Sequence, residues 1–368
     1  MITNLKSNKY LAFALLICLS FVFVAGCGGS NSTSTPSEEE PQETIELTFA
    51  HHWPAKHKVE TVMAQGWAKA IEEATDGRIK IVTYPGETLI PAAENYEGVV
   101  QGVADIGLSV YGYTRGRFPL IETFLLPGIN AKSSEVLSHA AMEVINKFNP
   151  KEIQDTKHLW TFGSGPMDII SNKPIRKLED LKGMMLGVPG GLGAVTLESL
   201  GGSPVSQPMS EWYESLQKGV MQGGVVAVNA MEGFRLGEVT GDYITLTPFL
   251  PQQLFYCVMN LEKWNSLPPD LQQTIIDVTE EFYPGSIPGV WDQENAGAVK
   301  RLSEKKPIEC IKLSEEETAR WLDKTQYLQD EHVEQLENKG LPGKEFLNAI
   351  KETVERLNKE YPDVQYGN

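Results

Sequence analysis

The sequence predicts an α/β protein with two lobes, each built on a mostly parallel sheet that helices cover. Three observations indicate this fold class. Segments with the patterns of strands and helices alternate twice in the order β-α-β-α-β, within residues 44–110 and again within 186–228. Similar residues recur in these two stretches at a constant offset. Finally, about 325 residues follow the N-terminal segments, which is more than a single hydrophobic core usually organises.

The first stretch opens with a strand-like segment and continues with a helix whose apolar residues share one face. Asp76 and Gly77 mark the end of that helix, because both residue types favour helix termini and turns. A second strand, a second helix and a third strand follow. The expected strands are residues 44–50, 78–84 and 105–110, and the expected helices are 59–74 and 92–102.

The second stretch repeats this order with shorter strands. The expected strands are 186–188, 203–207 and 224–228, and the expected helices are 193–200 and 210–220. The recurring residues are Tyr96-Glu97, Gly102-Val103 and Gly107 in the first stretch, and Tyr213-Glu214, Gly219-Val220 and Gly224 in the second. Ligands of such sheets bind beyond the carboxyl ends of the strands, so two similar lobes predict a ligand cleft between them.

The N-terminal segment predicts export and attachment to a membrane. Lys6 and Lys9 precede an apolar run over residues 11–24, which is too short to span a bilayer but suits a signal peptide. The run ends in Val24-Ala25-Gly26-Cys27, which resembles the lipobox of bacterial lipoproteins, where the cysteine carries a diacylglycerol. We therefore expect a signal peptide over 1–27 and a lipidated Cys27. An uncleaved anchor with an incidental cysteine is the alternative.

A disordered tether is expected over residues 28–44. Residues 28–43 are Gly, Ser, Thr, Asn, Gln, Pro and Glu, which cannot bury enough apolar surface to fold. The formal net charge of −17 becomes −19 when Lys6 and Lys9 leave with the signal peptide. Such an acidic chain is a poor candidate for nucleic-acid binding, which needs clustered Lys and Arg.

The motifs of common enzyme and metal sites are missing from the sequence. It contains no Gly-x-Ser-x-Gly, no His-Glu-x-x-His and no P-loop, so we expect no catalysis. Without a CxxC or a His/Cys cluster we expect no metal, and we expect no cofactor. Cys257 and Cys310 can pair in an oxidising compartment. Because each lies in an apolar, strand-like run, we favour two separate buried thiols.

Seven segments between residues 45 and 350 carry a family resemblance. They are Phe49–His57, Thr75–Lys80, Gly98–Gly107, Ile175–Gly183, Leu200–Pro204, Glu211–Val220 and Asn260–Pro268. Together and in this order they resemble the DctP family, the substrate-binding subunits of tripartite ATP-independent periplasmic (TRAP) transporters. The resemblance implies a fold like that of type II periplasmic binding proteins, with mixed, mostly parallel sheets, crossover segments, long bridging helices and closure over a ligand.

The resemblance also implies a role and a location. The protein is expected to be a monomer outside the cytoplasmic membrane, in a periplasm or on a Gram-positive surface. It would capture an organic acid or an aromatic compound and deliver it to the two membrane subunits of a permease. A receptor for a membrane sensor kinase and a binding subunit of an ATP-driven importer are the alternatives. We expect lobe I over 45–165 plus 255–295, and lobe II with the C-terminal helices over 166–254 plus 296–368.

One position departs from the family. The strand after Asp180-Leu181-Lys182-Gly183 usually carries an arginine whose planar guanidinium pairs with a ligand carboxylate through two parallel hydrogen bonds. In this sequence that position is Gly187, and no arginine lies between Arg176 and Arg235. Either the ligand lacks a carboxylate or another group binds it, and Arg117, with Arg115 beside it, is then the candidate.

Eleven residues are expected to contact the ligand. His52 and Trp53 follow the first strand, where one can donate a hydrogen bond and the other can stack on a ring. Tyr111 and Tyr113 end the third strand, and Asn229 ends the corresponding strand of the second stretch. The whole set is His52, Trp53, Glu87, Tyr111, Tyr113, Arg117, Gly187, Trp212, Asn229, Phe249 and Phe255.

These residues predict a class of ligand. Because Gly187 leaves room and removes a charge, we expect a bulky or flat molecule held by aromatic stacking, and weak binding of short C4-dicarboxylates. Phe249 and Phe255 flank the expected crossover between the lobes and can supply rings. Each stacked pair adds about 0.5–1.5 kcal/mol beyond area burial. If the ligand is nevertheless an acid, Arg117 is its expected partner.

Overall fold

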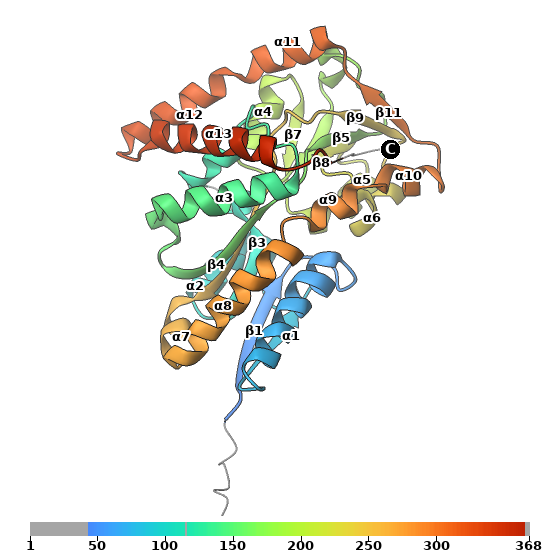
Figure 1. Ribbon diagram of the computed structural model, residues 1–368. Coiled ribbons are helices and arrows are strands. Elements are labelled where there is room, and N and C mark those ends of the chain that lie inside the picture. The colour runs from blue at the N-terminus through green and yellow to red at the C-terminus, as the bar shows by residue number, and fades with distance from the viewer. Residues whose placement is uncertain (1–42, 115, 365–368) are drawn as a thin grey trace, which may run out of the picture. The chain divides into compact units, whose positions relative to one another are not determined.

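The computed structural model describes residues 43–114 and 116–364. The expected signal peptide, Cys27, Arg115 and all but the last two residues of the expected tether lie outside these ranges. Within the described ranges, no helix is both long enough and apolar enough to cross a bilayer. Residues 43–364 form two mixed sheets with their covering helices (Figure 1).

The first sheet contains β1 (Ile45–His51), β2 (Ile79–Tyr84), β3 (Ile106–Val110), β4 (Thr156–Gly163) and β10 (Leu254–Asn260). The strand order is β2-β1-β3-β10-β4. β1 pairs in parallel with β2 and β3, whereas β10 runs antiparallel to β3 and β4. β3 and β10 are buried along their whole length, as expected of central strands covered on both faces.

The second sheet has the same plan. It contains β5 (Asp168–Ser171), β6 (Met185–Val188), β7 (Ser203–Ser206), β8 (Gly223–Val226), β9 (Tyr243–Leu246) and β11 (Glu309–Lys312). The order is β11-β9-β5-β8-β6-β7, and β5 is the antiparallel strand. Both β-α-β-α-β stretches and the mixed, mostly parallel sheets therefore agree with the fold predicted from the sequence.

The first lobe is covered by helices on both faces. They are η1 (Val59–Ala64, a π-helix), α1 (Gln65–Ala74), α2 (Asn95–Val100), α3 (Ser134–Phe148), α7 (Leu261–Ser266), α8 (Pro269–Ser286) and α9 (Val290–Asn295). Short 3₁₀ turns complete it: η2 (Ala92–Glu94), η3 (Tyr111–Tyr113), η4 (Ile121–Leu125) and η5 (Lys151–Ile153). Within this lobe α1 is joined to α8, because the indole N–H of Trp67 on α1 donates to Thr279 Oγ1 on α8 at 2.9 Å.

The second lobe uses shorter helices. They are α4 (Leu192–Ser199), α5 (Trp212–Gln217), α6 (Ala230–Gly233), α10 (Ala298–Ser303) and α11 (Glu315–Thr325), with the turns η6 (Leu178–Leu181), η7 (Met209–Glu211) and η8 (Leu236–Glu238). The glycines of the sequence repeat occupy equivalent places in the two lobes. Gly102 and Gly219 end the helices with φ of 75° and 71°. Gly107 and Gly224 let the preceding helix approach the strand, because a Cβ on either would clash with it.

The last two helices pack on the first lobe. α13 (Gly343–Glu360) lies beside α3, and α12 (Tyr327–Asn338) packs against α13 (Figure 1). Leu336, Phe346 and Ile350 share a hydrophobic core with residues of α3. We expected lobe II with the C-terminal helices over 166–254 plus 296–368; α10 and α11 pack in the core of the second lobe, and α12 and α13 pack in that of the first. α11 and α12 together form the bridging helical segment.

Two of the segments in which the chain crosses between the lobes, residues 164–167 and 247–253, are joined to each other by hydrogen bonds. Thr247 N–H donates to Asp168 Oδ1 at 2.9 Å, and Ser164 N–H donates to the Gln253 carbonyl at 2.8 Å. The second segment is the crossover predicted between Phe249 and Phe255. Cys257 is buried in β10, Cys310 is exposed on β11 and both are free, so the expectation of two buried thiols is wrong for Cys310, which lies on an edge strand.

Candidate functional site

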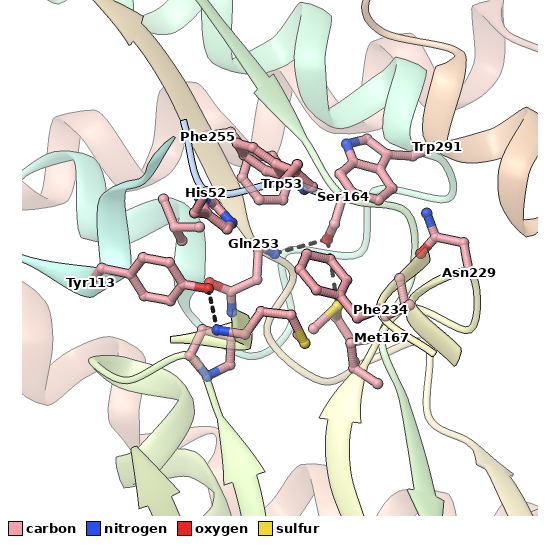
Figure 2. A pocket seen from close by; sticks show the side chains of 16 residues that line it. His52, Trp53, Tyr113, Ser164, Met167, Asn229, Phe234, Gln253, Phe255 and Trp291 are labelled. Atoms are coloured by element: carbon pink, nitrogen blue, oxygen red, sulfur yellow. Dashed lines mark hydrogen bonds between the residues drawn. The ribbon is translucent and has the colours of Figure 1, made fainter. Parts of the chain in front are cut away.

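A cavity lies where β1, β3, β6 and β8 end, which is the edge of such sheets where ligands bind. Residues of both lobes line it, and its volume is only about 40 Å³, because the lobes lie close together. The lining residues are His52, Trp53, Val110, Tyr113, Ser164, Met167, Pro189, Met209, Val226, Ala227, Asn229, Ala230, Phe234, Gln253, Phe255 and Trp291 (Figure 2).

Stacked rings of the first lobe form one wall of the cavity. Phe255 lies between Phe162 and Trp291, with ring centroids at 4.7 and 5.5 Å and interplanar angles of 28° and 21°. Phe255 is therefore held by ring packing and is almost wholly buried. The Trp53 ring packs against the His52 ring, with the ring centroids 3.7 Å apart. This packing fixes the His52 ring in place.

Phe234 of the second lobe forms the opposite wall (Figure 2). Its ring is nearly parallel to that of His52, at an interplanar angle of 21° and a centroid separation of 6.4 Å. Carbon atoms in contact are about 3.5–4.0 Å apart, so a flat ring between two others needs about 7–8 Å. A small separation of the lobes would therefore admit an aromatic ring between His52 and Phe234.

Several polar atoms of the lining have no hydrogen-bond partner within the described part of the chain. They are His52 Nδ1, Asn229 Oδ1 and Nδ2, Gln253 Oε1 and Trp291 Nε1. All four residues are at least nine-tenths buried. A buried polar group without a partner costs about 1–3 kcal/mol, so unpaired groups gathered at one cavity indicate a ligand that completes them.

The lining carries no formal charge. None of its sixteen residues is acidic or a Lys or Arg. Burial, with smaller effects of His51 and His57, holds the pKa of His52 well below its ordinary value, so His52 is neutral at pH 7. Burial also raises the pKa of the Tyr113 phenol, which stays protonated. Among residues 43–114 and 116–364, no group of three His, Cys, Asp or Glu side chains could hold a metal ion.

The structure places five of the eleven predicted residues in this lining. They are His52, Trp53, Tyr113, Asn229 and Phe255. Four of them follow strands that end at the cavity, which is the position from which the sequence predicted them, and Phe255 lies at the start of β10, beside the predicted crossover. Their contact with a ligand stays a prediction.

Tyr111, Gly187 and Trp212 lie in the hydrophobic cores instead. The Tyr111 hydroxyl bonds with Thr161 Oγ1 at 3.0 Å, and its ring packs on Phe118. Gly187 does not open a space, because a Cβ there would lie 2.9 Å from the Trp212 ring and 2.8 Å from Met221 Sδ. Trp212 is fully buried, so its ring fills the place that a side chain at 187 would take.

The Arg117 side chain has its partners outside the cavity. Its guanidinium pairs with Glu97 at 3.0 Å, with Asp155 and with the Glu152 carbonyl, and lies over the Tyr96 ring. It is therefore not available to a ligand in the cavity, and the expectation that it binds an acid is wrong for this arrangement.

Glu87 and Phe249 lie outside the lining as well. Glu87 Oε1 accepts from Ser210 Oγ at 2.8 Å and so links the two lobes. Phe249 borders a different cavity, beside Lys132 and Asp168.

Sequence reasoning missed several lining residues. Gln253 lies between the two crossover phenylalanines and could have been found from that position. Phe234 and Trp291 carry no motif, because they reach the cavity from short helical segments whose packing only the structure reveals. Ser164 positions the crossover by accepting from Gln253 N–H at 2.9 Å.

Comparison with known proteins agrees with this fold. Residues 49–336 match the model of the family described as bacterial extracellular solute-binding protein, family 7 (DctP). A TRAP periplasmic solute-binding protein of Desulfovibrio salexigens has a similar solved structure, with 33% identity and a TM-score of 0.74 over 87% of this chain and 98% of that one.

Two further relatives extend the comparison. A TRAP solute-binding protein of Rhodoferax ferrireducens, solved with copurified benzoate, is 25% identical, with a TM-score of 0.79 over 86% of this chain and 99% of that one. A curated solute-binding protein of Albidiferax ferrireducens is 24% identical over 220 residues. That match covers 58% of this chain and 64% of the relative, slightly less than two thirds of its length.

Proposed function

Because the chain belongs to the DctP family of bacterial extracellular solute-binding proteins, we propose that it captures a small, flat aromatic compound outside the cytoplasmic membrane and delivers it to the permease of a TRAP transporter. The observation that carries this proposal is the buried, ring-walled cavity between the lobes. The near-parallel rings of His52 and Phe234, one from each lobe, lie just under the separation that holds a ring between them. The relative with copurified benzoate supports the same class of ligand.

The gap between His52 and Phe234 explains why capture and closure belong together. Each ring belongs to a different lobe, so a ligand ring between them contacts both lobes at once. The binding energy of that contact favours the closed form over the open form. A permease can then distinguish loaded from empty receptor by its shape.

The proposal includes a lipid anchor at Cys27. The motif Val24-Ala25-Gly26-Cys27 and the polar segment after it motivate this part of the proposal. Mass spectrometry of the membrane-extracted protein tests it, and an unmodified Cys27 would count against the anchor.

A thermal-shift screen of the protein against aromatic compounds and C4-dicarboxylates tests the ligand class. A ligand at 100 times its Kd should add about 2.7 kcal/mol to the free energy of unfolding. We expect aromatic compounds to stabilise the protein and succinate or malate to leave it unchanged. Phe234→Ala should reduce the stabilisation, whereas Phe249→Ala, which removes an equally half-buried ring outside the cavity, should not. Stabilisation by dicarboxylates alone would overturn the proposal.

A further inference from the structure

The proposed function leaves open which polar group the aromatic ligand carries. The polar residues that line the cavity indicate the type of this group. Resting on that function, we infer that the ligand head group is uncharged and both donates and accepts hydrogen bonds, as an aromatic carboxamide does, and is not a carboxylate. The inference concerns the part of the ligand that faces Asn229, Gln253 and His52.

The unpartnered atoms at the cavity are of both kinds. Asn229 offers a donor, Nδ2, and an acceptor, Oδ1, and neither has a partner in the described residues. Gln253 adds a second acceptor, Oε1. Trp291 Nε1 is an unpartnered donor as well. A carboxylate only accepts hydrogen bonds, so it can pair with the donors but leaves the two acceptors without a partner. A carboxamide can donate through its N–H groups and accept through its oxygen, which satisfies the set.

Among the described residues, the lining holds no Lys or Arg to compensate an anion. Gly187 stands at the strand position where the resemblance to the DctP family leads one to expect an arginine. The Trp212 ring lies where a side chain at 187 would begin. Arg117 pairs with Glu97 and Asp155. His52 is neutral for the reason given above. An ionised carboxylate buried without a charged partner is strongly unfavourable, and a neutral polar group with hydrogen-bond partners is not.

Two carboxylates act on the Tyr113 side of the cavity. Tyr113 lines the cavity, and the carboxylates of Glu87 and Glu211 both act on its hydroxyl. Glu87 also closes the mouth through Ser210. An anion entering here meets like charges, whereas a neutral ring does not, so access and binding favour the same class of ligand.

Isosteric pairs provide the test, because each acid has nearly the shape of its amide. Calorimetric titration at pH 7.5 with benzamide against benzoate, and with nicotinamide against nicotinate, measures the preference directly. We expect the amide to bind at least tenfold more tightly than its acid. Asn229→Leu should remove this preference, and Asn338→Leu, an exposed asparagine on α12, should retain it.

The outcomes separate the two proposals. Tighter binding of the acids would overturn this inference and leave the proposed aromatic receptor intact. An amide preference that survives in Asn229→Leu would also overturn it, because the head group would then lie elsewhere. If neither the amides nor the acids bind, this inference and the proposed ligand class both fail.

Discussion

At the scale of single residues, Gly187 has no side chain, and this lets the Trp212 ring and Met221 pack against its backbone. The sequence suggested that glycine leaves room for a ligand, but in the structure the room belongs to Trp212 and Met221. The indole N–H of Trp212 donates to the Gln207 carbonyl at 3.1 Å and holds the ring in place. Glycine at 187 therefore supports the packing of the second lobe and does not line the candidate cavity.

This packing makes Gly187→Ala a sharp test. The added Cβ would approach Trp212 and Met221 to 3.0 Å or less, so we expect a loss of about 1–3 kcal/mol in the free energy of unfolding. Urea denaturation measures it. The matched control is Gly193→Ala on α4, where a Cβ meets no atom within 4 Å and should be neutral or slightly stabilising. Equal stability of the two variants would show that position 187 is not tightly packed.

At the scale of elements, two hydrogen bonds hold the mouth of the cavity closed. Met209 N–H at η7 donates to the Tyr113 hydroxyl oxygen at 3.0 Å, and Ser210 Oγ donates to Glu87 at 2.8 Å (Figure 2 shows the first). In each pair one residue belongs to the first lobe and the other to the second. They are contacts that exist only when the lobes are together.

Removing the first of these contacts should speed ligand release. In Tyr113→Phe the ring stays and the acceptor is lost, at a cost of about 0.5–1.5 kcal/mol, so we expect affinity to fall about two- to tenfold, mainly through faster dissociation. Stopped-flow measurement of the dissociation rate checks this. Tyr213→Phe, whose exposed hydroxyl contacts Glu238 away from the mouth, should leave the rate unchanged. An unchanged dissociation rate in Tyr113→Phe would show that this hydrogen bond does not hold the cavity closed.

The crossover segments also carry a buried acid. Asp168 begins β5, and burial raises its pKa to about 7, although the hydrogen bond from Thr247 N–H opposes the shift. Because the folded state holds its proton more tightly than the unfolded state, this residue lowers stability as pH rises from about 4 to about 7. The loss amounts to at most about 4 kcal/mol.

Asp168→Asn should remove this dependence. Asparagine keeps the acceptor for Thr247 and never ionises, so the variant should be more stable than the wild type at pH 8 and similar to it at pH 4. Chemical denaturation at the two pH values measures the difference. A variant that is less stable at pH 8 would indicate that the ionised carboxylate is the stabilising form.

Much of this element-level arrangement could be predicted from the sequence. The two β-α-β-α-β stretches, the crossover near Phe249 and the strand-end positions of His52 and Asn229 follow from local periodicity and turn residues. The packing of α12 and α13 on the first lobe could not be predicted, because their amphipathic faces fit either lobe. Phe234 and Trp291 were missed for a similar reason: their role depends on tertiary packing and leaves no local pattern.

At the scale of the whole molecule, the ring-walled cavity lies between the two lobes. Rings of the first lobe and Phe234 of the second enclose it, and the crossovers at 164–167 and 247–253 connect the lobes beside it. Ligand binding should therefore couple to lobe closure, since the same side chains serve both. Hinge closure of this kind needs only a few residues to change their backbone angles.

The most direct test of this account is a crystal structure with the most stabilising member of the benzamide and benzoate pairs. The account predicts a ligand ring between His52 and Phe234, with its polar head at Asn229. It also predicts Tyr113 and Met209 in contact. Ligand density instead beside Lys132 and Phe249, or at the cavity lined by His139 and Tyr283, would contradict the assignment of the site.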